Sequence, residues 1–238
     1  MQRLNDLPTL QVGGHTLHLL PQRAAYLHQH RMLLVADAHI GKAVSFRRLG
    51  VPVPGGTTSE TLNRLTAAVA ATAAQHIVFL GDLLHSARSR APATWASVAQ
   101  WRAQHAGLQL TLVRGNHDSH AGDPPPEWQV ACLDGPLRLG DADHSHGLAL
   151  SHHPDPVPGA YVLAGHVHPA AVIVGRANER LRLPCFHFGP RVGVLPAFGA
   201  FTGMHVMPRG PGDRVFVVAG DAVRALPGRP EAGQDPAA

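Results

Sequence analysis

The sequence contains little cysteine, which narrows the kinds of protein it can encode. Only Cys132 and Cys185 occur among 238 residues, and they are not spaced as a C-x-x-C pair. This pattern excludes a disulfide-stapled secreted domain and a zinc knuckle made of cysteines. We therefore expect two free thiols in a reducing cytoplasm.

Long apolar runs are also missing. No uninterrupted apolar stretch approaches the roughly 20 residues that a membrane-spanning helix needs. The first residues, from Met1 to Asp6, lack the apolar segment of a secretory signal. We expect a cytoplasmic protein with no membrane contact.

Lysine and aromatic residues are scarce as well. Lys42 is the only lysine, so almost all of the 20 basic residues are arginine, and the formal net charge is +4. A basic balance favours anionic partners such as nucleic acid. Aromatic residues make up 5% of the chain, and we find neither a stacking platform nor an RNA-binding signature. Any nucleic-acid contact should therefore be made to the backbone and not to the bases.

The length and the apolar periodicity predict one α/β domain. A chain of 238 residues is within the range of a single domain, which we place at residues 1–227, with a disordered tail at 228–238. Alternating runs predict a hairpin over residues 9–20 and a strand over 24–27. The segment 40–56 is rich in Pro and Gly beyond Leu49 and predicts a basic loop.

Two helices separate the strands of the first half. Residues 58–74 carry apolar residues at helical intervals after Thr57 and Glu60, which have capping-box spacing. Residues 92–105 begin with a proline and precede Gly107. Strands that alternate with helices predict parallel pairing with right-handed crossovers. The second half shows short strands and no helical period.

Several apolar runs end on residue types that bind metals. We interpret each run as a buried strand that delivers side chains to the carboxyl edge of a sheet, where ligand sites tend to lie. Gly81, Gly115 and Gly165 precede such residues and permit close approach of the backbone. In chain order the ends read D-x-H (Asp37, His39), G-D (Asp82), G-N-H-D (Asn116, His117, Asp118), H-H (His152, His153) and G-H-x-H (His166, His168).

This ordered set resembles the calcineurin-like metallophosphoesterases. The resemblance implies an α/β/β/α sandwich, in which two mixed β-sheets are flanked by helices and two divalent metal ions are bound. Carried over to this sequence, it assigns one ion to Asp37, His39, Asp82 and His168, and the other to Asp82, Asn116, His152 and His166. Asp82 would bridge the two ions. Imidazole, carboxylate and amide ligands suit manganese, iron or zinc better than calcium or magnesium.

Other residues of these motifs receive catalytic roles from the same resemblance. His117 would contact the phosphate and assist the leaving group, and Asp118 would orient His117. Two roles stay open for His85: it would either support the metal ligands or contact the substrate. We prefer His152 to His153 as the ligand, because in this family the ligand closes an apolar strand.

A narrower resemblance covers most of the chain. The runs D-x-H-I-G-K and F-R-R-x-G-x-P-V-P-x-G, followed by L-P-A-F-G-x-F-T-G at residues 195–203, are similar to the bacterial ligase-associated DNA-damage-response metallophosphoesterases. Members are regarded as manganese-dependent phosphodiesterases and DNA endonucleases encoded beside a helicase and a DNA ligase. The resemblance implies DNA, single-stranded or flexible, as the substrate, with helicase and ligase as partners.

The segment 40–56 supports a polyanionic substrate. Lys42, Arg47 and Arg48 lie there, and we expect them to hold phosphates that flank the scissile one. Two other functions remain open. A phosphomonoesterase or nucleotide hydrolase would use the same metals, and a non-catalytic scaffold would be expected to have lost ligands.

Overall fold

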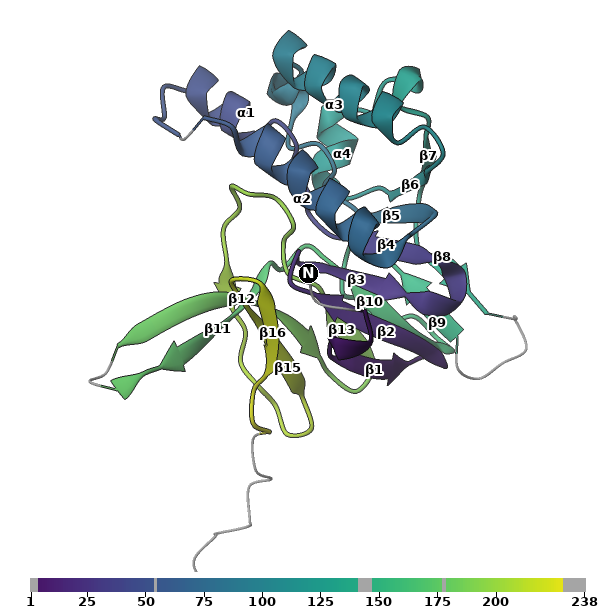
Figure 1. Ribbon diagram of the computed structural model, residues 1–238, viewed down its shortest axis with the longest axis vertical. Helices are drawn as coiled ribbons and strands as arrows, with labels where there is room; N and C mark the ends of the chain where they lie inside the picture. Colours follow the sequence, from purple (N-terminus) through teal and green to yellow (C-terminus); the bar gives the residue numbers. More distant parts are fainter. Residues whose placement is uncertain (1–3, 54, 141–146, 177–178, 229–238) are drawn as a thin grey trace, which may run out of the picture.

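The computed structural model describes residues 4–53, 55–140, 147–176 and 179–228. Two β-sheets stack on each other, and helices cover the outer face of the first sheet (Figure 1). The predicted fold class, α/β with two mixed sheets and helices, is confirmed. The single domain at 1–227 stays a prediction, and the predicted tail beyond Gly228 is outside the described residues.

The first sheet follows the order of the chain. β1 to β4 pair antiparallel, and β4 to β7 pair parallel, as expected for strands joined by helices. The predicted hairpin around Gly13 is present as β1 and β2. The strands are β1 (Thr9–Val12), β2 (His15–Leu20), β3 (Ala24–Leu27), β4 (Met32–Val35), β5 (His76–Leu80), β6 (Gln109–Val113) and β7 (Val130–Leu133).

All α-helices of the described residues precede Gly122. They are α1 (Lys42–Arg48), α2 (Thr57–Thr72), α3 (Pro92–Gln104) and α4 (Asn116–Ala121), with 3-10 turns at Leu4–Asp6, His28–His30, Ala87–Ser89 and Pro126–Trp128. A helical layer on the second sheet is therefore absent from the described part of the chain. None of the described helices is long and apolar enough to cross a membrane.

Two local predictions of the first half were wrong. Residues 42–48 form α1, because the Pro and Gly residues of the predicted loop begin only after Leu49. Helix α2 has no capping box: its N-cap is Gly56, and Glu60 instead pairs with Arg64 at 2.7 Å. Helix α4 begins within the G-N-H-D motif and continues past Asp118 to Ala121.

The second sheet is mixed and has the spatial order β14-β11-β12-β13-β10-β9-β8, with β15 and β16 added beside β12. Its strands are β8 (Leu137–Leu139), β9 (Gly147–Leu150), β10 (Ala160–Ala164), β11 (Pro169–Val174), β12 (Arg180–Phe188), β13 (Val192–Val194), β14 (His205–Val206), β15 (Arg214–Ala219) and β16 (Ala222–Ala225). Strand β12 escaped prediction because it begins with alternating arginines and contains Pro184.

Two hydrophobic layers hold this arrangement together. Leu62 and Leu65 of α2 and Trp101 of α3 pack on the first sheet. Leu34 of β4 belongs to the second layer, which fills the space between the sheets. The central strands β4, β5 and β6 are thus buried on both faces, which fixes where their carboxyl ends meet.

Candidate metal centre

The predicted ligands come together at one edge of the stacked sheets. Asp37 and His39 follow β4, Asp82 follows β5, and Asn116 begins α4 directly after β6. The remaining three come from the second sheet: His152 follows β9, and His166 and His168 lie between β10 and β11. The site therefore lies where both sheets end, and neither half of the chain builds it alone.

The ligand loops have an unusual backbone. Asp37, His39, Asp82, His166 and His168 all have positive φ, between 44° and 69°. Non-glycine residues seldom adopt this conformation, and it concentrates at functional sites where the surrounding structure enforces it. The pairs 37/39 and 166/168 thus lie in left-handed turns beyond the strands, because β4 stops at Val35 and β10 at Ala164.

One group of donors consists of Asp37, His39 and His168, whose ligand atoms lie within 4.8 Å of one another. The two Nε2 atoms of His39 and His168 are 3.3 Å apart. Oδ1 of Asp37 lies 3.5 Å from Nε2 of His168. The Nε2 atoms of the two histidines and a carboxylate oxygen of Asp37 thus lie close together.

A second group gathers around His152. Its Nε2 lies 2.9 Å from Oδ1 of Asn116 and 3.1 Å from Nδ1 of His166. The same Nε2 is 3.4 Å from Oδ1 of Asp82. The resemblance assigned these same residues to one ion.

Asp82 lies between the two groups. Its Oδ1 faces His152, while its Oδ2 lies 3.8 Å from Nε2 of His39. The backbone N–H of His117 donates to Oδ1 at 3.0 Å, which holds the carboxylate in place. Each oxygen of one side chain therefore faces a different donor group.

The structure distinguishes His152 from its neighbour. The His152 side chain is buried, and its Nδ1 lies 3.0 Å from the carbonyl oxygen of Leu80. A carbonyl can only accept, so Nδ1 carries the proton and Nε2 has a lone pair that is available to a metal ion. His153 is exposed, although its ring lies 4.4 Å from that of His166 and 4.7 Å from that of His152, close enough to form a further group of donors with them.

The charge balance of the site calls for cations. Asp37 and Asp82 are almost fully buried. Burial raises the pKa of Asp82, and the charge of Asp37 adds to the shift. Burial, with the nearby Lys42 ammonium, lowers the pKa of His39 far below its usual value. Neutral imidazoles around buried carboxylates are the donor set that divalent ions complete, so the residues fit a metal centre.

Three glycines make room for these side chains, as predicted. A Cβ atom on Gly81 would lie 2.1 Å from Nδ1 of His152, and one on Gly115 would lie 2.4 Å from Oδ1 of Asp82. A Cβ atom on Gly165 would lie 2.6 Å from Oδ2 of Asp37. Any larger residue at these positions would displace a predicted ligand.

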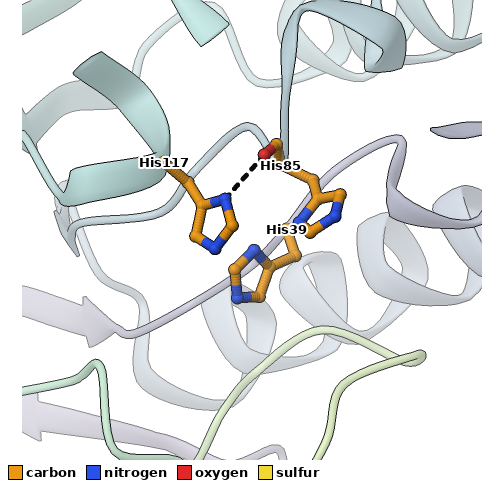
Figure 2. Close-up of side chains that lie close together, drawn as sticks. All are labelled: His39, His85 and His117. Carbon is orange, nitrogen blue, oxygen red and sulfur yellow. Dashed lines mark hydrogen bonds between the residues drawn. The ribbon is translucent and has the colours of Figure 1, made fainter. Parts of the chain in front are cut away.

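His117 extends from α4 toward the centre, and Figure 2 shows its ring beside those of His85 and His39. Its Nδ1 lies 2.8 Å from the backbone carbonyl oxygen of His85, and its Nε2 lies 3.9 Å from Oδ2 of Asp82. Burial and the Lys42 ammonium lower the pKa of the His85 side chain to about 4. His85 is thus a neutral ring at pH 7.

Asp118 does not orient His117, and this prediction was wrong. Its Oδ1 accepts from the backbone N–H of Leu84 at 3.2 Å, and its Oδ2 accepts from that of Gly115 at 2.9 Å. The side chain is buried at the start of α4 and ties the loops that carry Asp82 and Asn116. The backbone carbonyl of His85, and not Asp118, orients the His117 ring.

The three basic residues of α1 do not lie together. Lys42 begins the helix close enough to Asp82 and Asp37 for their charges to act on its ammonium, and burial lowers its pKa. Arg47 and Arg48 lie five and six positions later, roughly 8 to 9 Å along the helix axis, and are exposed. Arg48 donates to the carbonyl of Arg88 at 2.8 Å.

The loop 195–203 supports the site in a way that its sequence did not reveal. The N–H of Phe198 donates to the carbonyl of Ala36 at 2.8 Å, and that of Gly199 donates to the carbonyl of Asp37 at 3.1 Å. The motif was visible in the sequence, but these are backbone contacts, so residue types alone could not assign them.

Comparison with solved structures shows an extensive likeness to a nuclease. The crystal structure of the Pseudomonas putida nuclease MPE is 41% identical, with a TM-score of 0.80 over 92% of this chain and 100% of that chain. Two other solved structures are much less similar to this chain. They are a protein of unknown function, AQ665, from Aquifex aeolicus (TM-score 0.38, 17% identity, 58% of this chain and 78% of that one) and Yfce, a phosphoesterase from E. coli (TM-score 0.37, 14% identity, 81% and 90%).

No family model matches the chain, and no curated protein matches it either. The assignment therefore rests on the nuclease structure, which the chain resembles over nearly its whole length, together with the donor groups at the sheet edge. The chain belongs to the calcineurin-like metallophosphoesterases, in the family of the Pseudomonas putida nuclease MPE, and is a metal-dependent phosphoesterase.

Proposed function

We propose that this chain is a two-metal phosphodiesterase that cleaves DNA as an endonuclease. The likeness to a nuclease supports this substrate, and the net charge of +4 favours a polyanion. The position of Asp82 carries the proposal. Its two carboxylate oxygens face two separate groups of donors, as a bridge between two ions requires.

Manganese is the proposed metal, with iron and zinc as alternatives. Asp37, His39, Asp82 and His168 would hold one ion, and Asp82, Asn116, His152 and His166 would hold the other. When bound, such ions lower the pKa of water to supply a nucleophile and neutralise charge on phosphate oxygens. The hydrogen bond from Nδ1 of His152 to the carbonyl of Leu80 leaves Nε2 of His152 available to bind an ion.

His117 is the proposed general acid. Its Nδ1–H donates to the carbonyl of His85, which aims Nε2 toward Asp82 and the phosphate that would lie there. Protonated at Nε2, the ring gives its proton to the departing sugar oxygen as the P–O bond breaks. The side chain is 38% exposed, so solvent can return the proton.

Lys42 is the proposed phosphate contact at the centre. Its ammonium is attracted by Asp82 and Asp37, and a substrate phosphate close to the same carboxylates would meet this positive charge. Arg47 and Arg48 are proposed to contact the DNA backbone farther along the strand. These contacts do not depend on base identity.

The biological setting is proposed from the sequence alone. A role in DNA repair, with a helicase and a DNA ligase as partners and a cytoplasmic location, follows from the narrower family resemblance. We propose single-stranded or flexible DNA as the substrate. Affinity purification of the tagged chain from cells with damaged DNA, followed by mass spectrometry, tests both partners.

A nuclease assay with a panel of divalent metals tests the function. Single-stranded and duplex DNA, RNA, a bis(nitrophenyl) diester and the corresponding monoester are each incubated with the metal-free chain plus one metal. We expect internal cleavage of DNA and hydrolysis of the diester, fastest with manganese. Faster hydrolysis of the monoester would show a phosphomonoesterase instead, and inactivity with every metal would show a scaffold.

A further inference from the structure

Phe46 and Phe201 lie beside the metal centre and are only partly buried. Four other phenylalanines, at positions 79, 186, 188 and 198, are buried in the core. Phe46 belongs to α1 and Phe201 to the loop after β13, so distant parts of the sequence bring them together. Their ring centroids are 5.7 Å apart in an edge-to-face contact. Two aromatic rings are thus left partly open to solvent at this edge.

The two rings extend a row that starts at the proposed general acid. The His117 and His85 rings are 4.7 Å apart with a 31° angle between their planes, and the His85 and Phe46 rings are 5.8 Å apart with a 37° angle. Figure 2 shows the first two rings side by side. A nucleic-acid strand that leaves the centre past His117 and follows this row reaches the rings of Phe46 and Phe201.

Helix α1 places a phosphate contact and an aromatic ring on one face. Lys42 and Phe46 are four positions apart, which puts them on the same side of the helix one turn from each other. The Lys42 ammonium lies close enough to Asp82 and Asp37 for their charges to act on it. A strand whose phosphate contacts Lys42 therefore has a neighbouring base within reach of Phe46.

The backbone just before Phe201 is hydrogen-bonded to neighbouring segments. The N–H of Gly199 donates to the Asp37 carbonyl at 3.1 Å, and the N–H of Ala200 donates to Oγ1 of Thr61 at 3.2 Å. Phe201, Lys42 and His39 also line one small pocket of about 10 Å³. That volume admits one water-sized group and is too small for a nucleobase.

We propose that Phe46 and Phe201 form a stacking platform for a base of an unpaired DNA strand, next to the scissile phosphate. The inference rests on the proposed DNA endonuclease function and adds how an unpaired strand is selected. An unpaired base has a face free to stack on an aromatic ring, whereas a base inside a duplex does not. The sequence alone offered no such platform, because the two rings are neighbours only in the fold.

The test pairs removal of the rings with removal of bases. Cleavage of a short single-stranded oligonucleotide is measured with manganese, and each position around the cleaved bond is made abasic in turn. With the wild-type chain, loss of one base beside the cleaved bond should raise KM by about 5- to 150-fold, the range expected for one stacked base. With the double variant Phe46→Leu, Phe201→Leu, the intact oligonucleotide should show the raised KM, and abasic substitution should add little.

Control variants separate stacking from packing. Leucine keeps an apolar contact between α1 and the loop, and Phe201→Tyr keeps the ring and should retain the wild-type KM. Phe216→Leu alters another half-buried phenylalanine, which packs against Phe188 in β12, and should also leave KM unchanged. Metal content and kcat on the bis(nitrophenyl) diester show that the centre is intact.

Two results would overturn the platform. One is an equal penalty for abasic substitution in the wild type and the leucine double variant, since independent effects mean no ring–base contact. The other is a parallel loss on the small diester, which would show that the rings only shape the metal centre. Failure of the wild-type chain to cleave any DNA would refute the proposed function itself, a distinct outcome.

Base stacking also has a spectroscopic signature. A 2-aminopurine base at the sensitive position should lose fluorescence when the metal-free wild-type chain or Phe201→Tyr binds the oligonucleotide. The leucine double variant, at concentrations that saturate binding, should leave the fluorescence unquenched. Equal quenching by all three proteins would refute the platform.

Discussion

The Nδ1 atom of His117 lies 2.8 Å from the backbone carbonyl oxygen of His85. This contact fixes which nitrogen of the ring carries a permanent proton, so only Nε2 is free to exchange one with the substrate. The hydrogen bond comes from the main chain of the segment that also supplies Asp82. The proposed acid and the proposed bridging ligand are therefore positioned by one loop.

The first prediction concerns His117→Ala. A deoxyribose alkoxide is a poor leaving group and needs a proton, whereas nitrophenolate does not. We expect kcat/KM for DNA cleavage to fall by ~10²–10⁴-fold and hydrolysis of the bis(nitrophenyl) diester to fall much less. Metal content should be unchanged, because no ion is assigned to His117.

The matched control for this variant is His120→Ala. His120 lies on the same helix, is exposed, and bonds its Nδ1 to the carbonyl of Asn116 at 2.7 Å. We expect near wild-type rates on both substrates. A parallel fall on DNA and diester in His117→Ala would contradict general acid catalysis and leave His117 as a phosphate contact.

The second prediction is that Asp82→Ala abolishes hydrolysis and weakens binding of both ions, since one carboxylate faces both donor groups. His39→Ala should be milder, because it removes a donor from one group only. Elemental analysis of the purified variants, with activity titrated against manganese, measures the effect. Two tightly held ions and retained activity in Asp82→Ala would show that this residue is not a bridge.

The third prediction separates the basic residues of α1. Removing charge at Lys42, Arg47 and Arg48 together should raise KM for DNA and flatten its salt dependence, because fewer counterions are released on binding. Lys42→Ala should account for most of the loss, since only Lys42 is close to the carboxylates. The small diester should be little affected by Arg47→Ala and Arg48→Ala.

A control for this charge series is Arg138→Ala. Arg138 is exposed on β8 and belongs neither to α1 nor to a group of metal donors. It should leave both KM and the salt slope unchanged. Equal effects of Arg138 and the α1 residues would point to general electrostatic attraction and not to a contact.

The fourth prediction assigns Asp118 a structural role. Its buried carboxylate accepts two backbone hydrogen bonds, so Asp118→Ala leaves the N–H groups of Leu84 and Gly115 without it. We expect the free energy of unfolding to fall by about 1–3 kcal/mol, as measured with urea. The ratio of DNA to diester activity should stay constant. A selective loss on DNA at unchanged stability would restore the original idea that Asp118 acts on His117.

The fifth prediction compares two glycines. In Gly81→Ala the new Cβ meets the His152 ring, at a residue with φ of 74°, so the ring must move or the loop must open. We expect destabilisation of at least about 1–3 kcal/mol and weaker metal binding. Gly107→Ala, where no atom lies within 4 Å, should be neutral. Normal metal binding in Gly81→Ala would show that His152 is not held as the structure has it.

Local patterns predicted the elements best where the chain is regular. The hairpin around Gly13 and the helices α2 and α3 were found because their apolar residues repeat at intervals of two or near 3.6. Strand β12 was missed because its first part is exposed and carries arginines. The predicted capping box of Thr57 and Glu60 is not formed, because Arg64, one turn later, pairs with Glu60 instead.

The sequence by itself determined the chemistry of this protein. The order of Asp, His and Asn residues after apolar runs pointed to the metallophosphoesterases and to the donor set. Only the tertiary structure decided how those donors are arranged: left-handed turns, not strand ends, pair Asp37 with His39, and the His85 carbonyl, not Asp118, orients His117. Main-chain contacts and backbone conformation of this kind depend on how distant segments pack, and residue types do not encode them locally. The same holds for Phe46 and Phe201, which become neighbours only when the two sheets meet.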